Sequence, residues 1–280
     1  MHLRLKEERL DLDSPVVMGI LNVTPDSFSD GGEYRDVAKA RERAAQMLDE
    51  GAQIIDIGGE STRPGAESIS PEEEIDRLLP VVEYVARTLA ARVSVDTSKA
   101  AVMCAAVDAG AVMINDVYAL RRDGALQAAA ELETAVCLMH MQGEPRTMQD
   151  EPEYDALPDD VIHFLERRVA ACREAGIADD RIAVDPGFGF GKDAGHNLEI
   201  LANLDRFRDL GLPLLVGLSR KRTLGSVTGR GPSDRVSAGL AAAVIAVLQG
   251  AHIVRTHDVA ATVDALRMVD AVRRASPDYS

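Results

Sequence analysis

The sequence of 280 residues contains no tryptophan and only three cysteines, Cys104, Cys137 and Cys172. Three widely spaced cysteines provide neither a disulfide framework nor a CxxC motif for a metal or a redox reaction. We therefore expect all three to be buried thiols of a protein in the reducing cytoplasm, and none of them to be a catalytic nucleophile.

Basic residues are also scarce relative to acidic ones. The chain has 31 Lys plus Arg against 46 Asp plus Glu, a formal net charge of −15. Such a surface would repel nucleic acid and anionic membranes, so both are excluded as partners. An anionic ligand of this protein must instead bind in a local cationic pocket.

Neither a secretory leader nor a membrane span is predicted. The first residues, MHLRLKEERLDLDSP, carry charges throughout and have no apolar core, so we expect the protein to stay in the cytoplasm. One long uncharged run spans 236–254, but polar or flexible residues interrupt it: Ser237, Gly239, Gln249, Gly250 and His252. We interpret the run as an Ala-rich buried helix, a turn and the start of a strand, and the helix as a candidate subunit interface.

Short apolar runs recur along the chain, at 16–23, 54–59, 93–97, 112–117, 135–140, 182–186, 213–219 and 252–258. Their composition with little alternation is typical of parallel strands covered on both faces. A helical pattern follows each run, at 36–51, from Ser70 onward, and at 98–110, 123–132, 158–176, 197–210, 232–249 and 258–275. Ser70, Pro71 and three glutamates mark a helix start, and Gly51 and Gly110 mark helix ends.

This alternation predicts an α/β fold, a (β/α)₈ TIM barrel, as a single domain over 1–280 with its core at about 15–275. The alternative is an open doubly wound sheet, which normally carries a glycine-rich phosphate turn after its first strand. Thr24, Pro25 and Asp26 follow the first strand here, which does not fit that turn. No linker or low-complexity tract divides the chain.

Polar residues stand at the carboxyl ends of nearly all the predicted strands, where the active sites of barrels are built. One such residue could simply cap the next helix, but eight converging sets are hard to explain by capping alone. The sets contain Asn22, Glu60, Thr62, Arg63, Asp96, Asn115, Asp116, His140, Gln142, Asp185, Ser219, Lys221, Arg255, His257 and Asp258.

These residue types divide into two groups. The first suits a flat heterocycle with several N–H groups and ring nitrogens, because it combines carboxylate acceptors with an amide and a cation. It comprises Asp96, Asn115, Asp185 and Lys221. The second suits phosphate oxygens and a metal ion, and its amide oxygen ligand indicates Mg²⁺ held mostly by water and substrate phosphates. It comprises Asn22, Thr62, Arg63, Arg255 and His257.

The glycine-rich run GFGFGK at 187–192 looks like a phosphate loop but fits neither GxGxxG nor GxxxxGK[ST]. Pro186 stands where the second pattern needs a glycine, and Asp193 follows the lysine. We expect a flexible turn after Asp185 that lets Phe188 or Phe190 cover a ring ligand.

Several motifs occur in a specific order: MGILNVTPDSFSDGG (18–32), GGESTRPG (58–65), VSVDT, IND, LMHMQG, DPGFGFGK, GLSRK and RTHDV. Through them, and over essentially its whole length, the sequence resembles the dihydropteroate synthases, pterin-binding enzymes of bacterial folate biosynthesis. The resemblance implies a transferase that condenses 6-hydroxymethyl-7,8-dihydropterin diphosphate with 4-aminobenzoate, giving 7,8-dihydropteroate and pyrophosphate. It also implies Mg²⁺, a homodimer and inhibition by sulfonamides.

The resemblance further implies a role for each matching position. The pterin pocket would comprise Asp96, Asn115, Met139, Asp185 and Lys221. The diphosphate would contact Asn22, Thr62, Arg63, Arg255 and His257, with Asn22 also the contact to Mg²⁺. The 4-aminobenzoate would lie among Phe28, Pro64, Phe190 and Ser219. The residues expected to act in catalysis are Asp96, Lys221, Arg63, Arg255 and His257.

No residue is an obvious nucleophile or strong base, so the hypothesis is a dissociative displacement in which Arg63, Arg255, His257 and Mg²⁺ stabilise the leaving diphosphate. The loops that carry Phe28 and Arg63 are expected to close over 4-aminobenzoate. Two alternatives remain: a folate-binding methyltransferase with a similar pterin pocket, and a non-catalytic pterin-binding paralogue.

Overall fold

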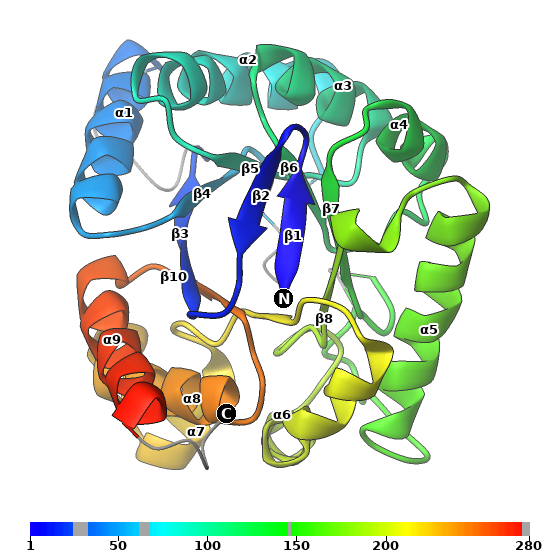
Figure 1. Cartoon of the computed structure of the whole chain (residues 1–280), viewed down its shortest axis with the longest axis vertical. Helices are drawn as coiled ribbons and strands as arrows, with labels where there is room; N and C mark the ends of the chain where they lie inside the picture. Colours follow the sequence, from blue (N-terminus) through cyan, green and yellow to red (C-terminus); the bar gives the residue numbers. More distant parts are fainter. Residues whose placement is uncertain (25–32, 62–67, 145–146, 276–280) are drawn as a thin grey trace.

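The structure, a computed structural model, describes residues 1–24, 33–61, 68–144 and 147–275. Eight parallel strands stand in the order β8-β7-β6-β5-β4-β3-β10-β9, and helices surround them as a ring (Figure 1). The strands are β3 (Val16–Asn22), β4 (Ile54–Gly58), β5 (Val93–Asp96), β6 (Met113–Asp116), β7 (Ala135–Met139), β8 (Ile182–Asp185), β9 (Leu215–Val216) and β10 (Ile253–Thr256). All eight fall within the predicted runs, which confirms the barrel.

The helices follow the strands as predicted. They are α1 (Glu33–Asp49), α2 (Pro71–Glu83), α3 (Ala100–Ala109), α4 (Ala125–Glu131), α5 (Asp159–Glu174), α6 (Ala194–Ala202), α7 (Arg222–Thr228), α8 (Val236–Leu248) and α9 (Val259–Ala275). Short helical turns join them: η2 (Tyr84–Thr88), η3 (Asp179–Arg181), η4 (Leu204–Leu210) and η5 (Pro232–Asp234). The predicted caps are present, since Ser70 Oγ accepts the Glu73 N–H at 3.2 Å and Gly110 ends α3 with φ 120°. The helix α7 was not predicted.

The ring of strands closes at a weak seam between β8 and β9. β9 has only two residues, and the contact across the seam is a single parallel bridge between Val184 and Leu214. Val184 N–H donates to Pro213 O at 2.9 Å beside that bridge. The other seven junctions between neighbouring strands are ladders of paired residues, so the β8–β9 seam is the junction with the least strand pairing.

An antiparallel hairpin of β1 (His2–Leu5) and β2 (Glu8–Asp11), which the sequence analysis did not predict, lies across one end of the barrel (Figure 1). Its leucines pack on the amino-terminal residues of the strands. This buried cluster contains Leu3, Leu5, Leu10, Leu12, Val16, Met18, Ile54, Met113, Ala135, Cys137, Ala183, Leu215 and Ile253. The hairpin therefore closes the amino-terminal end of the barrel with apolar side chains.

Inside the barrel, every second residue of a strand points to the axis, and its chemistry changes along the strand. Met18 precedes Asn22 on β3, Ile54 precedes Asp56 on β4, and Ile253 precedes Arg255 on β10. Apolar side chains thus fill the end near the hairpin, and polar ones fill the carboxyl end. We call that carboxyl end, with Asn22, Asp56, Asp96, Asn115, Asp185, Arg255 and His257, the barrel mouth.

Two expectations about burial need correction. Cys137 and Cys172 are buried, but Cys104 is exposed, so the prediction for Cys104 is wrong. The helix α3 buries Met103 and Val107 against the core, and the 3.6-residue period turns residue 104 outward. The helix α8 buries Ala243, Ala246 and Val247, whereas its other face leaves Ile245 and Leu248 each 45% exposed. Within the described residues, no helix is long and apolar enough to cross a membrane.

Candidate active site

Strand register brings four positions of the barrel mouth into one row. Asn22 pairs with Gly58, Gly58 with Asp96, and Asp96 with Asn115, each on neighbouring strands. Gly58 supplies no side chain between its neighbours. A Cβ there would lie 3.6 Å from Asn22 Oδ1 and 3.8 Å from Asp96 Oδ2. The sequence-predicted oxygen ligand Asn22 therefore lies beside the predicted pterin residue Asp96.

An ion-pair network around Arg255 crosses the barrel mouth. Arg255 Nε donates to Asp56 Oδ2 at 2.6 Å, and Arg255 Nη2 donates to Asp96 Oδ2 at 2.8 Å. Asn115 Nδ2 donates to the same Asp56 oxygen at 3.2 Å. One guanidinium thus donates to two carboxylates, and Asp56 links Asn115 to it. The network therefore fixes the positions of Arg255, Asp96 and Asn115 relative to one another.

Asp56 is a site residue that the sequence analysis missed. Its side chain is fully buried, and its Oδ1 has no hydrogen-bond partner among the described residues. Asp56 lies inside the apolar run IIDIGG, whereas the predicted site residues stand at the carboxyl ends of the runs. A carboxylate within a buried strand was itself a signal, because a buried charge needs a partner.

Burial changes the protonation of the barrel mouth. It raises the pKa of Asp96 to about 7, against the attraction of Arg255 and with the support of the negative Asp56 and Glu74. The pKa of Arg255 is raised by Asp56 and Asp96, so this cation keeps its charge. Two acids that share one cation leave room for a further positive charge on a ligand.

Asp185 and Lys221 lie on the other side of the barrel mouth. Asp185 is buried, its Oδ1 accepts the Gly187 N–H at 2.7 Å, and burial raises its pKa to about 6. The Lys221 ammonium lies 4.2 Å from the centre of the Phe190 ring, a cation–π contact. Burial and the nearby Arg255 lower the pKa of Lys221 to about 8. Asp185 is the last residue of β8, and Lys221 is the N-cap residue of α7 after β9; their role toward a heterocycle stays a prediction.

The two aromatic residues of the 187–192 run have different surroundings. Phe188 is 2% exposed and packs in the main hydrophobic core, so it does not cover a ligand. Phe190 is partly buried and packs on Met139 and Met141 in a separate cluster at the barrel mouth. Of the two candidates, only Phe190 therefore remains available to cover a ligand, and that role stays a prediction.

Lys192, which received no role from the sequence, ties this run together. Only 2% exposed, its Nζ donates to Gly187 O and Phe190 O, each at 3.0 Å, and to His140 Nδ1 at 2.8 Å. The prediction of a flexible turn is therefore incomplete, because the buried Lys192 ammonium donates hydrogen bonds to two carbonyl groups of the turn. Burial lowers the pKa of Lys192 to about 7, whereas the Asp185 carboxylate favours its charged form.

Ser219 and His257 form a pair that fixes a tautomer. Ser219 Oγ accepts the backbone N–H of His257 at 3.2 Å and lies 3.0 Å from His257 Nδ1. A hydroxyl that accepts this N–H still has its own proton to donate, and when it donates to Nδ1 the proton of the neutral ring stands on Nε2. Burial and Arg220 lower the pKa of His257 to about 4, so it is a neutral donor at pH 7.

Four predicted site residues, Phe28, Thr62, Arg63 and Pro64, lie outside the described residues. The ends of the segment that contains the last three are nevertheless anchored. Glu60 Oε1 accepts the Ile69 N–H at 3.0 Å, and Glu60 Oε2 pairs with Lys99 Nζ at 3.2 Å. Lys99 also pairs with the buried Glu74 at 2.6 Å. This network was not foreseen, because Glu74 lies on α2 and Lys99 is the N-cap residue of α3, so neither stands at a strand end.

The oxygen atoms of the barrel mouth fit a hard cation only in part. Asn22 Oδ1 and the unpartnered Asp56 Oδ1 are suitable ligands for Mg²⁺. Over the described part of the chain, however, no cluster of three His, Cys, Asp or Glu side chains could hold a metal. A metal here would need most of its ligands from a substrate and water, as the sequence suggested.

Comparisons with known proteins agree with this chemistry. Residues 18–257 match the family described as pterin binding enzyme. The chain is 52% identical to the dihydropteroate synthase of Escherichia coli K12 over 266 residues, which are 95% of this chain and 94% of that protein.

Solved structures give the same result. Dihydropteroate synthase of Yersinia pestis, in a sulfonamide drug complex, is 51% identical with a TM-score of 0.93 and covers 98% of this chain and 100% of its own. Dihydropteroate synthase of Xanthomonas albilineans, in complex with 7,8-dihydropteroate, is 47% identical with a TM-score of 0.89, covering 98% and 99% of the two chains.

Proposed function

The chain belongs to the pterin-binding enzymes and, within them, to the dihydropteroate synthases, and on that premise we propose how its barrel mouth divides two substrates. The activity is a transferase reaction of folate biosynthesis. It joins 6-hydroxymethyl-7,8-dihydropterin diphosphate to 4-aminobenzoate and releases pyrophosphate. The methyltransferase and non-catalytic alternatives are not needed, because relatives about 50% identical over nearly the whole chain are dihydropteroate synthases.

The pterin ring binds between Asp96, Asn115 and Asp185, with Met139 against its face. Three observations support this placement: the row of Asp96 beside Asn115, the pairing of Met139 with Asp185 across β7 and β8, and the burial of Asn115, Met139 and Asp185. Carboxylate oxygens accept from ring N–H and amino groups, and a buried bidentate acceptor discriminates strongly against analogues that lack the donor. Lys221 donates to a ring acceptor from the opposite side.

The diphosphate binds at the open edge of the barrel mouth, near Arg255 and His257. Arg255 supplies fixed positive charge, and the neutral His257 donates from Nε2 because Ser219 holds its Nδ1. Arg63 and Thr62 are proposed to join from the segment beyond Ser61. Mg²⁺, where bound, would be held by Asn22 and the diphosphate and would supply charge neutralisation of the leaving group.

Bond breaking precedes bond formation in the proposed mechanism. The carbon–oxygen bond to the diphosphate breaks, its electron pair leaves on oxygen, and the pterin ring shares the positive charge that remains. Asp56 and Asp96 share the Arg255 cation, and a positive charge on the ring favours the ionised form of Asp96, whose pKa is about 7 without ligand. The amino nitrogen of 4-aminobenzoate then bonds to the carbon and releases one proton. Phe28, Pro64, Phe190 and Ser219 enclose this second substrate, and sulfonamides bind there in its place.

Pyrophosphate release from the two substrates is the assay that tests the function. A positional isotope exchange experiment tests the order of steps. With ¹⁸O in the bridging position and no 4-aminobenzoate, the label should scramble into non-bridging oxygens of recovered substrate. Recovery without scrambling contradicts the dissociative order.

Asp185→Ala should lose about 2–4 kcal/mol of pterin affinity, because ring N–H groups lose their acceptor. Unchanged affinity would contradict the assignment of Asp185 to the pterin pocket.

A homodimer is also proposed, through the exposed apolar face of α7 and α8. Val227 is 63% exposed, and Ile245 and Leu248 are each 45% exposed on neighbouring helices. A second copy of the chain would cover this face, and Ile245→Asp should shift sedimentation from dimer to monomer. A wild-type monomer in sedimentation would contradict this assembly.

The free state of all three cysteines supports a reducing, cytoplasmic location.

A further inference from the structure

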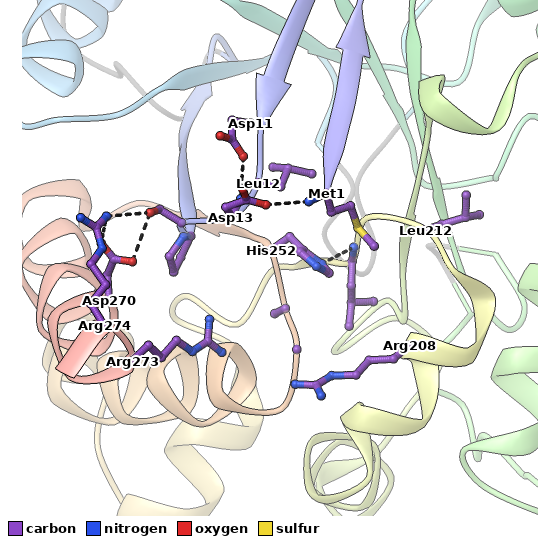
Figure 2. A pocket seen from close by; sticks show the side chains of 15 residues that line it. Met1, Asp11, Leu12, Asp13, Arg208, Leu212, His252, Asp270, Arg273 and Arg274 are labelled. Carbon is purple, nitrogen blue, oxygen red and sulfur yellow. Dashed lines mark hydrogen bonds and ion pairs between the residues drawn. The ribbon is translucent and has the colours of Figure 1, made fainter. Parts of the chain in front are cut away.

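A second hollow lies at the amino-terminal end of the barrel, far along the strands from the barrel mouth. It has a volume of about 790 Å³ and lies beside the hairpin, η4 and α9 (Figure 2). We call it the basal pocket; its lining includes Leu214, Arg208, Gly250, His252, Asp270 and Arg273. Nothing in the reaction uses these residues.

The carboxylates of the basal pocket are all engaged with protein groups. Asp13 Oδ1 pairs with the amine of Met1 at 2.6 Å, and Asp11 Oδ1 accepts the Asp13 N–H at 2.8 Å. Asp270 Oδ2 pairs with Arg274 at 2.6 Å. Among the described residues, none of these carboxylates forms an ion pair with Arg208 or Arg273, although the nearby Asp270 favours the charged form of Arg273.

Three donors of the basal pocket have capacity that no described residue takes up. The Arg208 guanidinium has no acceptor in the described part of the chain, and Arg273 Nε is buried without a partner. Arg273 Nη2 donates to Val247 O, which fixes the direction of that side chain. His252 Nδ1 accepts the Leu214 N–H at 3.1 Å, so the neutral ring carries its proton on Nε2.

The two guanidinium groups face each other. Figure 2 shows Arg273 reaching from α9 and Arg208 reaching from η4 toward the same space, and Gly250 and Ala251 line the pocket with them. Gly250 allows this approach, since a Cβ there would lie 2.3 Å from Arg208 Nε. Burial and the positive Arg208 lower the pKa of Arg273, against the effect of Asp270. Burial, with smaller effects of the amino terminus and the two arginines, lowers the pKa of His252 to about 4.

We propose that the basal pocket binds a phosphate-type oxoanion between Arg208 and Arg273, with His252 Nε2–H as a third donor. Two guanidinium groups and one neutral N–H are the donor set that oxoanions with several oxygens prefer. Opposed cations in a concave site also attract an anion in a chain of net charge −15.

The position of this pocket gives the anion a structural consequence. His252 holds the N–H of Leu214, and Leu214 forms the bridge to Val184 that closes the β8–β9 seam. An anion held by Arg208 and Arg273 would tie η4, which leads into β9, to the last helix α9. It therefore stabilises the seam by binding the folded state only.

Calorimetric titration of the wild-type protein with inorganic phosphate tests the proposal, with chloride at equal ionic strength as the reference. We expect saturable binding and a higher melting temperature in phosphate. The variant R208Q/R273Q should bind phosphate at least about tenfold more weakly, the loss expected for removal of charge-assisted hydrogen bonds. The control Arg274→Gln, whose residue lines the same pocket but pairs with Asp270, should retain wild-type affinity. Equal phosphate affinity in R208Q/R273Q and wild type overturns the proposal.

Pyrophosphate distinguishes this pocket from the barrel mouth. The wild type should bind two pyrophosphates per chain, and R208Q/R273Q should bind one, at the mouth. A stoichiometry of one for both proteins overturns the proposal. Because the double variant could be less stable, a crystal of the wild type soaked in selenate provides a second test. Anomalous density between Arg208 and Arg273 supports the site, and density confined to the barrel mouth overturns it.

Discussion

The two ends of the barrel are built from the same strands but use opposite chemistry. At the hairpin end, Leu3, Leu5 and Met18 are fully or almost fully buried among other apolar side chains. At the barrel mouth, Arg255, Asp56 and Asp96 are held by ion pairs of 2.6 and 2.8 Å. Burial of apolar side chains at the first end stabilises the fold. At the second end, desolvation of charged groups costs folding free energy, and the result is an arrangement of charges suited to a ligand.

This difference shows why one barrel can be both stable and reactive. A strand of four to seven residues spans both ends, so a single element contributes a Met or Ile to the core and an Asn or Arg to the mouth. Substitutions at the two ends should therefore separate stability from activity.

The largest effect is expected for Arg255→Met. Without the guanidinium, Asp56 and Asp96 remain as buried carboxylates facing each other, so the free energy of unfolding should fall by about 3–5 kcal/mol. The value of kcat/KM should fall at least about 100-fold, because a positive group at the leaving diphosphate is lost. Urea unfolding and pyrophosphate release measure the two effects.

The double variant R255M/D56N is the matched control. It removes one of the two uncompensated charges, so it should recover part of the stability and none of the activity. If Arg255→Met keeps kcat/KM within about tenfold of wild type, the diphosphate role of Arg255 is wrong.

Leu5→Ala should give the converse result. Leu5 is 1% exposed in the hairpin, and its truncation should lower the free energy of unfolding by about 2–5 kcal/mol through lost burial and a cavity. Because Leu5 lies at the opposite end from the mouth, kcat/KM below the melting transition should be unchanged. A matching loss of kcat/KM would show that the two ends are not independent.

Lys192→Met tests whether order in the 187–192 run is transmitted to Asp185. Loss of the ammonium leaves the Phe190 carbonyl without a donor and leaves the Gly187 carbonyl with the Phe190 N–H alone, which should cost about 1–3 kcal/mol of stability. As a positioning residue, Lys192 should affect KM for the pterin diphosphate more than KM for 4-aminobenzoate. Lower stability with both KM values unchanged would indicate a structural role alone.

Asp185→Asn should change how stability depends on pH. Burial raises the folded-state pKa of Asp185 to about 6 from its ordinary value of 3.8, so between these values the folded state holds a proton that the unfolded chain has lost. This contribution to stability is complete below pH 4 and is lost as the pH rises through about 6. In ligand-free protein, the wild type should therefore lose about 1–3 kcal/mol more than Asp185→Asn between pH 4 and 7. Parallel stability curves would contradict the raised pKa.

The smallest effect is expected for Arg173→Ala. Arg173 pairs with Asp179 at 2.7 Å, almost as closely as Arg255 pairs with Asp56. Both side chains of the Arg173–Asp179 pair, however, are more than half exposed. Solvent screening should reduce its contribution to about 0.5 kcal/mol or less in a urea melt. A loss as large as that of Arg255→Met would show that pairing distance, and not burial, decides the energy.

The sequence predicted all eight strands and the residue types at their carboxyl ends, because short apolar runs and strand-end polarity are local signals. It missed the β1–β2 hairpin, since the alternation in HLRL and ERLD lies within a charged segment. It missed α7, which has seven residues and follows directly after Lys221. The Cys104 error has the same origin, because composition does not tell which face of α3 meets the core.

The active-site partners could not be predicted from local pattern at all. Arg255 is 199 residues from Asp56 and 159 from Asp96 along the chain, and Lys192 is 52 from His140. Nothing in the sequence near Asp56 identifies its cation. The motif resemblance named Arg255 and Asp96 individually, but not the shared ion-pair network.

By itself, then, the sequence determined the order of strands and helices, the family and the chemical types available at the barrel mouth. It could do so because hydrophobic periodicity and motif spacing act over a few residues. Only the tertiary structure decided which acid shares Arg255, why His257 is a neutral donor, and where two unpaired arginines face each other at the far end. Those properties depend on distance and burial, and both are set only when strands far apart in the sequence pack together.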